Sequence, residues 1–140
     1  MSGHIKANCH CGAFKYSFTL PQPLYEYTVC HCNCSICEKN GYLLVYPKRK
    51  DVIFEKGMPT ISMCSDNGCR ITDSLSGNWD GLGEYKMATM DKIHKFCKNC
   101  ASTIGIDFRM IDRGVTDDPE KDIVALNVCS VCHVLQMMKC

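Results

Sequence analysis

Thirteen of the 140 residues are cysteine, and most of them stand in closely spaced groups. Three groups, at positions 9–11, 30–37 and 97–100, contain C-x-C or C-x-x-C pairs. The first residues lack the apolar stretch of a secretory signal, so we expect a cytoplasmic chain, with the nucleus as a second location. Thiols stay reduced there, and clustered cysteines then indicate metal ligands. A secreted, disulfide-bonded scaffold is the weaker alternative.

Composition supports a fold that depends on bound metal. Leu, Ile, Val and Phe together make up 31 of the 140 residues, which predicts a modest hydrophobic core. A small core needs disulfides or metal to reach ordinary stability. The 16 Lys and Arg against 15 Asp and Glu give a net charge of +1, which argues against nucleic acid or an anionic membrane as the partner. No apolar run has the length of a membrane span, and nothing in the sequence indicates the oligomeric state.

The chain consists mostly of short segments with strand character. Several alternate polar with apolar residues, as Ala13–Phe18 does, and turn residues separate them. Only Ser35–Asn40 and Lys48–Val52 have the character of helical turns. We therefore predict a mainly β, single-domain fold of short antiparallel strands. The expected strands are Gly12–Leu20, Tyr25–Cys30, Tyr42–Tyr46, Ile61–Cys64, Glu84–Thr89, Lys92–Phe96, Ser102–Phe108 and Ile123–Val128.

The first and last cysteine pairs predict one shared metal site. A tetrahedral zinc ion needs four ligands, with sulfur about 2.3 Å away. Cys97 and Cys100 supply two of them around a tight turn, and Cys9 and Cys11 supply the other two if they face the same side of a strand. Such a site closes a loop of roughly ninety residues and contributes on the order of 10 kcal/mol to folding.

The middle cysteine group predicts a second site of a different kind. Cys32, Cys34 and Cys37 lie in one short segment and have no distant fourth partner. Three protein ligands with one open position are typical of a reactive zinc ion, whereas closed sites are structural. Cys30 is the alternative fourth ligand, because alternate residues of a strand share a face. In that case the second site would be closed as well.

The same residues resemble the glutathione-dependent formaldehyde-activating enzyme family, which also includes centromere protein V. The resemblance covers residues 4 to 128 and includes all three cysteine motifs in the family's order. It implies a β-tent fold with two zinc ions per chain, one structural and one catalytic. The motifs are Cys9-His10-Cys11-Gly12-Ala13, Cys32-Asn33-Cys34-Ser35-Ile36-Cys37 and His94-Lys95-Phe96-Cys97-Lys98-Asn99-Cys100. By this resemblance the structural zinc belongs to Cys9, Cys11, Cys97 and Cys100, and the catalytic zinc to Cys32, Cys34 and Cys37.

Two departures from the family pattern stand out. The family has glycine after the last ligand, where this chain has Ala101; since that glycine serves a positive-φ turn, we expect an altered turn with the ligand kept. The end of the chain, Cys129–Cys140, does not resemble the family. We therefore assign residues 1–128 to the zinc-binding domain and 129–140 to an atypical cysteine-rich tail. A third metal site of Cys129, Cys132, His133 and Cys140 is the weaker alternative for that tail.

The resemblance implies a carbon–sulfur lyase that acts on an adduct of formaldehyde and glutathione, with a small thiol such as glutathione as its partner. The first alternative is a non-catalytic zinc-binding interaction module, which would follow if Cys30 closed the second site. A thiol redox protein is weaker, because the C-x-x-C pairs lack the βαβ context of such proteins.

Several other residues have an ordinary structural interpretation. We expect His10 and His31 to point away from the metal, Cys64 and Cys69 to be simple thiols, and His94 to be a strand histidine with its hydrogen bonds satisfied. Trp79 and Tyr85 are expected to pack, with a pocket as the alternative. The run Lys48-Arg49-Lys50 is expected to be a solvated turn, with attraction of an anionic thiol as the alternative.

Overall fold

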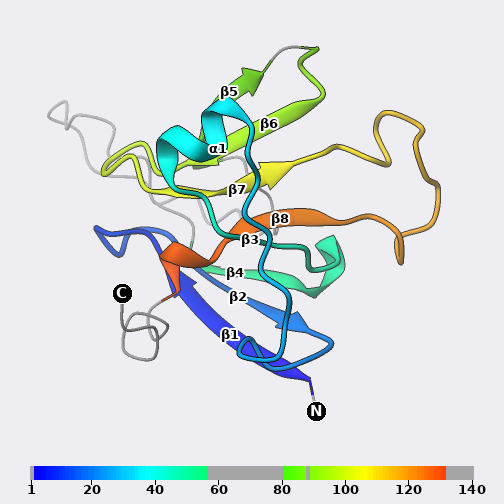
Figure 1. Ribbon diagram of the computed structural model, residues 1–140, viewed down its shortest axis with the longest axis horizontal. Coiled ribbons are helices and arrows are strands. Elements are labelled where there is room, and N and C mark those ends of the chain that lie inside the picture. The colour runs from blue at the N-terminus through cyan, green and yellow to red at the C-terminus, as the bar shows by residue number, and fades with distance from the viewer. Residues whose placement is uncertain (1, 57–80, 88, 132–140) are drawn as a thin grey trace, which may run out of the picture.

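A computed structural model describes residues 2–56, 81–87 and 89–131 of the chain. The predicted mainly β fold of short antiparallel strands is confirmed: two antiparallel sheets and one short α-helix make up most of the regular secondary structure in these residues (Figure 1). Within these residues, no helix is long and apolar enough to cross a membrane. The elements are β1 Gly3–Asn8, β2 Lys15–Leu20, α1 Ser35–Asn40, β3 Leu44–Val45, η1 Arg49–Asp51, β4 Val52–Lys56, β5 Gly83–Met87, β6 Lys92–Phe96, β7 Thr103–Asp107, β8 Val124–Asn127 and η3 Val128–Ser130.

The smaller sheet has the order β1-β2-β4, and β2 supplies most of its buried side chains. Tyr16, Phe18 and Leu20 are each about 1% exposed. Phe14 and Phe54 add rings beside Tyr16, with centroid distances of 5.1–6.2 Å among the three. These aromatic side chains bury a large apolar area for so short a strand.

The larger sheet has the order β3-β8-β7-β6-β5 and is packed on both faces. Val124 and Leu126 of β8 belong to the core shared with the smaller sheet, whereas Ala125 between them belongs to a second core. This alternation follows from the two-residue period of a strand. The second core also contains Cys37 and Tyr42, so α1 and the segment that leads into it cover the outer face of the larger sheet.

Close backbone approach shapes the centre of the larger sheet. Partners of β6 on β7 shift from Gly105 opposite Lys95 to Thr103 opposite Phe96, which leaves Ile104 as the extra residue of a bulge. A Cβ atom at Gly105 would lie 2.1 Å from the carbonyl oxygen of Ala125. Only glycine therefore fits at this point of the sheet.

Helix α1 ends in a Schellman motif. Gly41 is left-handed, with φ 62°, and its N–H donates to the Glu38 carbonyl while the N–H of Tyr42 donates to the Cys37 carbonyl. This motif holds Cys37 and Tyr42 next to each other on the side of α1 that packs on the sheet. The helix thus fixes Cys37, the last cysteine of the group at 30–37, against the second core.

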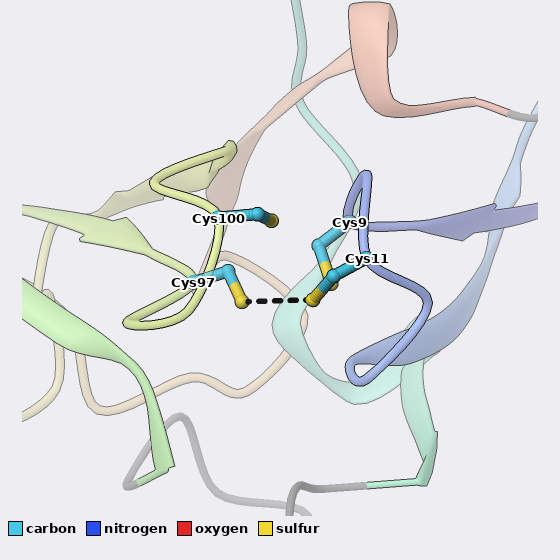
Figure 2. A group of neighbouring side chains, drawn as sticks. All are labelled: Cys9, Cys11, Cys97 and Cys100. Atoms are coloured by element: carbon cyan, nitrogen blue, oxygen red, sulfur yellow. Dashed lines mark hydrogen bonds between the residues drawn. The ribbon is translucent and has the colours of Figure 1, made fainter.

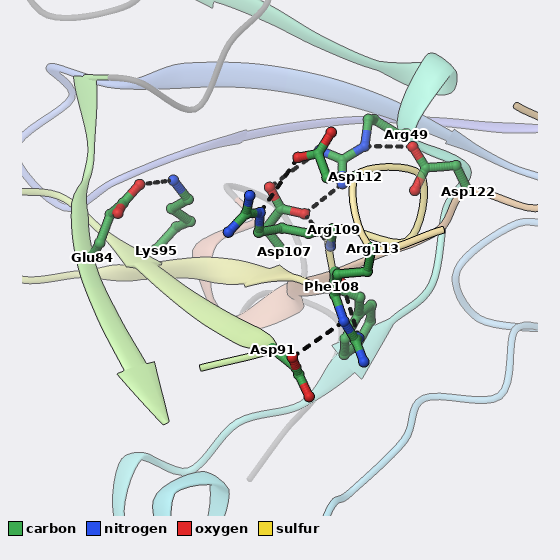
Figure 3. Close-up of polar contacts among 10 residues, drawn as sticks. All are labelled: Arg49, Glu84, Asp91, Lys95, Asp107, Phe108, Arg109, Asp112, Arg113 and Asp122. Atoms are coloured by element: carbon green, nitrogen blue, oxygen red, sulfur yellow. Dashed lines mark hydrogen bonds and ion pairs between the residues drawn. The ribbon is translucent and has the colours of Figure 1, made fainter. Parts of the chain in front are cut away.

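Arg49 connects three separate parts of the chain (Figure 3). Its guanidinium forms an ion pair with Asp107 at the end of β7 and a second, 2.7 Å long, with Asp122 before β8. Burial acts to raise the pKa of Asp107, but the hydrogen bonds from Arg49 and from the Arg109 backbone outweigh it and leave that pKa below its usual value. Both carboxylates are buried, so they depend on Arg49 for charge compensation.

Most of the predicted strands that lie in the described residues are present, including the edge strands β3 and β5. Helix Ser35–Asn40 and strand Lys92–Phe96 have the predicted bounds, and β2, β3, β5, β7 and β8 lie within or close to predicted strands. Tyr25–Cys30 is wrong as a strand: the N–H groups of Glu26 and Tyr27 donate to the Pro23 carbonyl and form a turn. Strands β1 and β4 were not predicted. The predicted strand Ile61–Cys64 lies outside the described residues.

Candidate metal centres

Cys9, Cys11, Cys97 and Cys100 come together from two distant turns (Figure 2). The first pair lies between β1 and β2 of the smaller sheet, and the second lies between β6 and β7 of the larger sheet. All four sulfur atoms lie within 4.8 Å of one another. The site therefore joins the two sheets at one edge of their shared core, where Cys9 and Cys97 are fully buried.

Both turns have the same hydrogen-bond frame. The N–H of Cys9 donates to the Phe14 carbonyl, and the N–H of Cys97 donates to the Ser102 carbonyl, five positions on in each case. The N–H of Phe14 also donates to Cys9 Sγ at 3.2 Å. Cys9 and Cys11 thus lie in a turn, and the prediction that a strand orients them was wrong. A turn brings two sulfurs to one point as well as a strand does.

Ala101 occupies the left-handed position of the second turn, with φ 59°. Its N–H donates to the Cys97 carbonyl at 2.8 Å, so the turn closes in spite of the side chain. Ala101 thus takes the positive φ that was expected to need glycine, and Cys100 stays with the other three cysteines. Gly12 has the corresponding positive φ, 72°, in the first turn. Alanine pays a conformational cost at such a φ that glycine avoids.

The sulfur spacing fits a tetrahedral zinc ion. Four sulfurs about 2.3 Å from zinc lie about 3.8 Å apart from each other in a regular tetrahedron. Cys9 Sγ lies 3.5 Å from Cys11 Sγ, which in turn lies 3.7 Å from Cys97 Sγ. These separations are far beyond a disulfide bond of about 2.0 Å, and the cysteines are free. The donor set is the one that structural zinc prefers.

The thiols of this group are electrostatically unequal. Burial raises the pKa of Cys97 to about 12. Burial acts in the same direction on the pKa of Cys100, but hydrogen bonding with the Ser102 side chain and the Cys11 backbone brings it to about 5. Four neighbouring sulfurs cannot all be thiolates without a cation between them, because like charges at these distances repel strongly. A divalent cation removes that conflict.

The second group consists of Cys32, Cys34 and Cys37, whose sulfurs also lie within 4.8 Å of one another. Cys34 immediately precedes α1 with an extended backbone, and Cys37 lies inside the helix. Hydrogen bonding from the Cys37 backbone lowers the pKa of Cys34, whereas burial raises the pKa of Cys37 to about 12. Cys37 is 2% exposed, but Cys32 and Cys34 are half-buried, so the group is open on one side.

Cys30 belongs to neither group of close sulfur atoms among the described residues. Its backbone pairs with Leu44 in both directions, at 2.8 and 2.9 Å, which anchors the segment to β3. Its side chain lies beside Tyr46, where burial and then the Cys30 thiol raise the pKa of the phenol. The alternative in which Cys30 completes a four-sulfur site is not what the structure shows.

His94 lies on β6 opposite Tyr85 and is 3% exposed. Its surroundings differ from the expectation of a strand histidine with satisfied hydrogen bonds. Neither ring nitrogen has a hydrogen-bond partner among the described residues, so its bonds are not satisfied there. The imidazole lies between two tyrosine rings, 5.9 Å from Tyr42 and 6.2 Å from Tyr85 by ring centroids. Burial, and then the charge of Lys92, lowers the pKa of His94 below its usual value.

The remaining predicted residues have no part in either group. His10 and His31 are exposed, and Cys129 lies 3.7 Å from the Gly41 carbonyl, outside both sulfur groups. Cys64, Cys69 and Trp79 lie outside the described residues, as does the tail beyond residue 131. The basic run Lys48-Arg49-Lys50 is paired with carboxylates throughout, since both lysines contact Glu120.

Fold and site together define a mainly β protein with two groups of cysteines that could each hold a metal ion, consistent with zinc. The structure is similar to the crystal structure of a Rhodobacter sphaeroides protein from structural genomics, with a TM-score of 0.62, 20% sequence identity and 96% of each chain covered. That similarity shows the fold. No protein-family model matches the chain, and no curated protein matches it.

Proposed function

We propose that this chain is a zinc-dependent carbon–sulfur lyase that acts on the adduct of a small thiol and an aldehyde, of the S-hydroxymethylglutathione type. The observation that carries the proposal is that, within the part of the chain the structure describes, three sulfurs come close together at Cys32, Cys34 and Cys37, with Cys30 outside the group. Three protein ligands are typical of a catalytic zinc, which keeps one position for an external ligand. The resemblance of all three cysteine motifs to the formaldehyde-activating family supports the same function.

Residues of the two groups have separate roles in this proposal. Cys9, Cys11, Cys97 and Cys100 would hold one zinc ion and stabilise the junction of the sheets. Cys32, Cys34 and Cys37 would hold the second, where bound zinc supplies a lowered pKa for a thiol ligand and Lewis acidity. The open side of this second group, at Cys32 and Cys34, is where a substrate can approach.

The reaction needs no oxidant or reductant. In the direction of synthesis, the substrate sulfur loses its proton and forms a bond to the aldehyde carbon. The π electrons of the carbonyl move to its oxygen, which takes up a proton to give a hydroxyl group. In the reverse direction the hydroxyl loses that proton, the carbon–sulfur bond breaks and its electron pair returns to sulfur.

Side chains around the second group can support this step. Tyr46 and Phe108 stack with their ring centroids 6.4 Å apart and pack against the second core, which limits the access of water. The Tyr46 phenol stays protonated, because burial raises its pKa, and it can donate a hydrogen bond to the oxygen that gains charge. Cys37 holds the site to the sheet, because it is the buried member of the group.

Exchange spectroscopy by NMR tests the proposal, because it measures the interconversion of free glutathione and S-hydroxymethylglutathione at equilibrium. The zinc-loaded protein should accelerate this exchange above the uncatalysed rate. Cys34→Ser should bring the rate back to the uncatalysed value, and Cys129→Ser, which changes an exposed cysteine outside both groups, should leave it unchanged. Wild-type protein that holds two zinc ions but gives no acceleration would leave the non-catalytic zinc-binding module as the better interpretation.

A further inference from the structure

A pocket of about 220 Å3 lies beside the Arg49 network, and none of the described residues that line it is a cysteine. Sites that enclose a drug-sized ligand have roughly 300–1,000 Å3, so this pocket suits a ligand of only a few heavy atoms. Two guanidinium groups, two carboxylates and one apolar side chain form its lining. The lining residues are Arg49, Arg109, Ile111, Asp112 and Asp122.

One wall of the pocket is the tightly turned start of the loop that follows β7 (Figure 3). The N–H of Arg109 donates to Asp107 Oδ1 at 2.8 Å, and Arg109 has a left-handed φ of 49°, which residues other than glycine rarely adopt. The N–H of Arg113 donates to the Arg109 carbonyl, and its guanidinium pairs with Asp91 in the β5–β6 turn at 3.3 Å. The lining residues of this loop are therefore positioned by contacts outside the pocket.

Asp122 has a buried carboxylate oxygen that no described residue satisfies (Figure 3). Its side chain is 4% exposed, and its Oδ2 atom accepts a hydrogen bond from Arg49 Nε at 2.7 Å. Its Oδ1 atom has no hydrogen-bond partner among the described residues. A buried acceptor without a hydrogen bond destabilises a fold unless water or a ligand reaches it. Because Asp122 lines the pocket, a donor that enters the pocket can supply that bond.

The charges around the pocket leave one carboxylate in excess. Two guanidinium groups face three carboxylates: Arg49 and Arg109 against Asp107, Asp112 and Asp122. Both oxygens of Asp107 accept hydrogen bonds from Arg49, and Asp112 contacts Arg109 at 3.4 Å. The excess negative charge therefore falls on Asp122, whose second oxygen has no donor.

The lysines nearest in sequence to these groups pair with other carboxylates. Lys48 and Lys50 both contact Glu120, and Lys121 contacts Asp118 at 3.8 Å. No lysine among the described residues lines the pocket. Within the described part of the chain, nothing supplies the additional cation that would balance the excess carboxylate.

A primary ammonium group fits this pocket better than a metal ion does. Calcium and magnesium take six or more oxygen ligands, whereas the lining has two carboxylates beside two guanidinium groups. Among the described residues, only the two cysteine groups bring three metal-binding side chains close together. An ammonium group has three N–H donors. On a short alkyl chain it also brings an apolar part that can pack on Ile111, which is 42% exposed.

We propose that this pocket binds a small primary alkylamine as its ammonium ion, with the ammonium group donating to Asp122 Oδ1 and the alkyl chain lying against Ile111. Asp112 adds a second carboxylate at the rim, since its side chain is 65% exposed. The inference goes beyond the proposed lyase activity and does not depend on it. A neutral molecule of the same size gains only the contact with Ile111 and should bind much more weakly.

Chemical-shift titration by NMR of the zinc-loaded protein tests the pocket with three probes of similar size: n-butylamine, 1-butanol and butyrate. At pH 7 the amine is protonated, as the lysine side chain is. At constant ionic strength it should shift the amide signals of residues 109–113 and 122 and saturate with a Kd of about 1–10 mM. The alcohol and the carboxylate should shift these signals only at concentrations more than about tenfold higher.

Two variants of exposed side chains should change the affinity in opposite directions. Asp112→Asn removes a carboxylate and should weaken n-butylamine binding about two- to fivefold, whereas Arg109→Met removes a competing cation and should tighten it by a similar factor. Asp117→Asn is the matched control, because Asp117 is exposed in the same loop and does not line the pocket. It should leave the affinity unchanged.

Asp122→Asn is the most direct test, because asparagine keeps the shape of the side chain and removes its charge. In a folded Asp122→Asn protein, n-butylamine should bind more than about tenfold more weakly. If this variant does not fold, the opposite effects of Asp112→Asn and Arg109→Met decide the question. Equal affinities in both of those variants would overturn the pocket. Tighter binding of butyrate than of n-butylamine would overturn the sign of the ligand, and amine-induced shifts confined to residues 32–37 would place the amine at the three-cysteine group instead.

Discussion

The sulfur atoms of Cys11 and Cys97 lie 3.7 Å apart, although 86 positions of the chain separate the two residues. Cys11 belongs to the turn that leads into the smaller sheet, and Cys97 follows β6 of the larger one (Figure 2). This contact links two sheets that otherwise meet through side-chain packing, the hydrogen bond from the His10 N–H to Ser102 Oγ and a backbone bridge between Ala7 and Val131. Loss of the link should therefore affect the whole fold.

Removal of one sulfur from the four-cysteine group should destabilise the protein strongly. Cys97→Ser leaves a poorly compensated metal site and a buried hydroxyl, so we expect the melting temperature to fall by more than about 10 °C. The comparison is with Cys129→Ser in the same buffer, measured by circular dichroism with and without a zinc chelator. An unchanged melting temperature for Cys97→Ser would contradict the assignment of this group as a structural site.

Loss of a sulfur from the three-cysteine group should be much milder for the fold. Cys32, Cys34 and Cys37 lie close together in sequence, so a metal ion there closes only a short loop and constrains little of the unfolded chain. We expect Cys34→Ser to stay folded and to retain about one zinc ion per chain, against two for the wild type. Atomic emission and a thermal melt measure both quantities. A Cys34→Ser protein that unfolds as Cys97→Ser does would show that both groups are structural.

Ala101 gives a stabilising substitution. Because its φ is 59°, Ala101→Gly should relieve left-handed strain and raise the free energy of unfolding by about 0.5–1 kcal/mol, or the melting temperature by about 2–4 °C. Ala13→Gly is the matched control in the other cysteine turn, since Ala13 has no positive φ. Ala13→Gly should lower the free energy of unfolding. If both variants lowered the free energy of unfolding, the argument from the positive φ of Ala101 would be wrong.

The Arg49 network predicts a specific dependence on pH (Figure 3). The pKa of Asp107 is below its usual value in the fold, so the wild type gains stability from it above the unfolded pKa of about 3.9 and loses it as the pH falls further. Arg49→Met leaves two buried carboxylates without a counter-charge and should lower the free energy of unfolding by about 2–3 kcal/mol at pH 7. This is a small effect for a broken buried ion pair, because the Arg49 side chain is 31% exposed.

The sign of the pH effect should reverse in the variant. Without Arg49, only the Arg109 backbone N–H and the charge of Lys95 still oppose burial, which favours the protonated form of Asp107. The deficit of Arg49→Met should therefore shrink as the pH falls from 7 to 5. Denaturant unfolding of the wild type and of Arg49→Met at each pH gives the difference in their free energies of unfolding. Any effect of pH on the metal sites acts on both proteins and cancels in this difference. A deficit that is constant with pH would show that the pair with Asp107 adds no stability.

Local patterns were sufficient for part of the fold. Gly41 after a short polar helix indicates where α1 ends, and the alternation of Lys92–Phe96 indicates a strand; both segments have the predicted bounds. Tyr25–Cys30 shows the limit, because Leu24, Tyr27 and Val29 pack individually on the core from a turn, and strand-forming residue types cannot reveal that no partner strand is present. Strand β1 buries little beyond Ala7, so its pattern is weak.

The cysteine groups were easier to predict than their surroundings. A tetrahedral ion needs four donors, and this requirement pairs Cys9 and Cys11 with Cys97 and Cys100 across the chain. The requirement does not depend on secondary structure, which is why a turn in place of a strand did not change the outcome. His94 could not be found in this way, because the lack of a hydrogen-bond partner depends on every element packed around it.

The larger sheet separates the two cysteine groups, with Cys9 and Cys97 in the core on one face and Cys37 in the core on the other. Under zinc starvation the group with fewer sulfurs should empty first, since affinity grows with the number of thiolates that share the ion. In the enzyme proposed above, folded molecules would then persist in an inactive form and regain the proposed activity when zinc returned, with no need for new synthesis. Catalytic output, and not the amount of folded protein, would follow the supply of the metal.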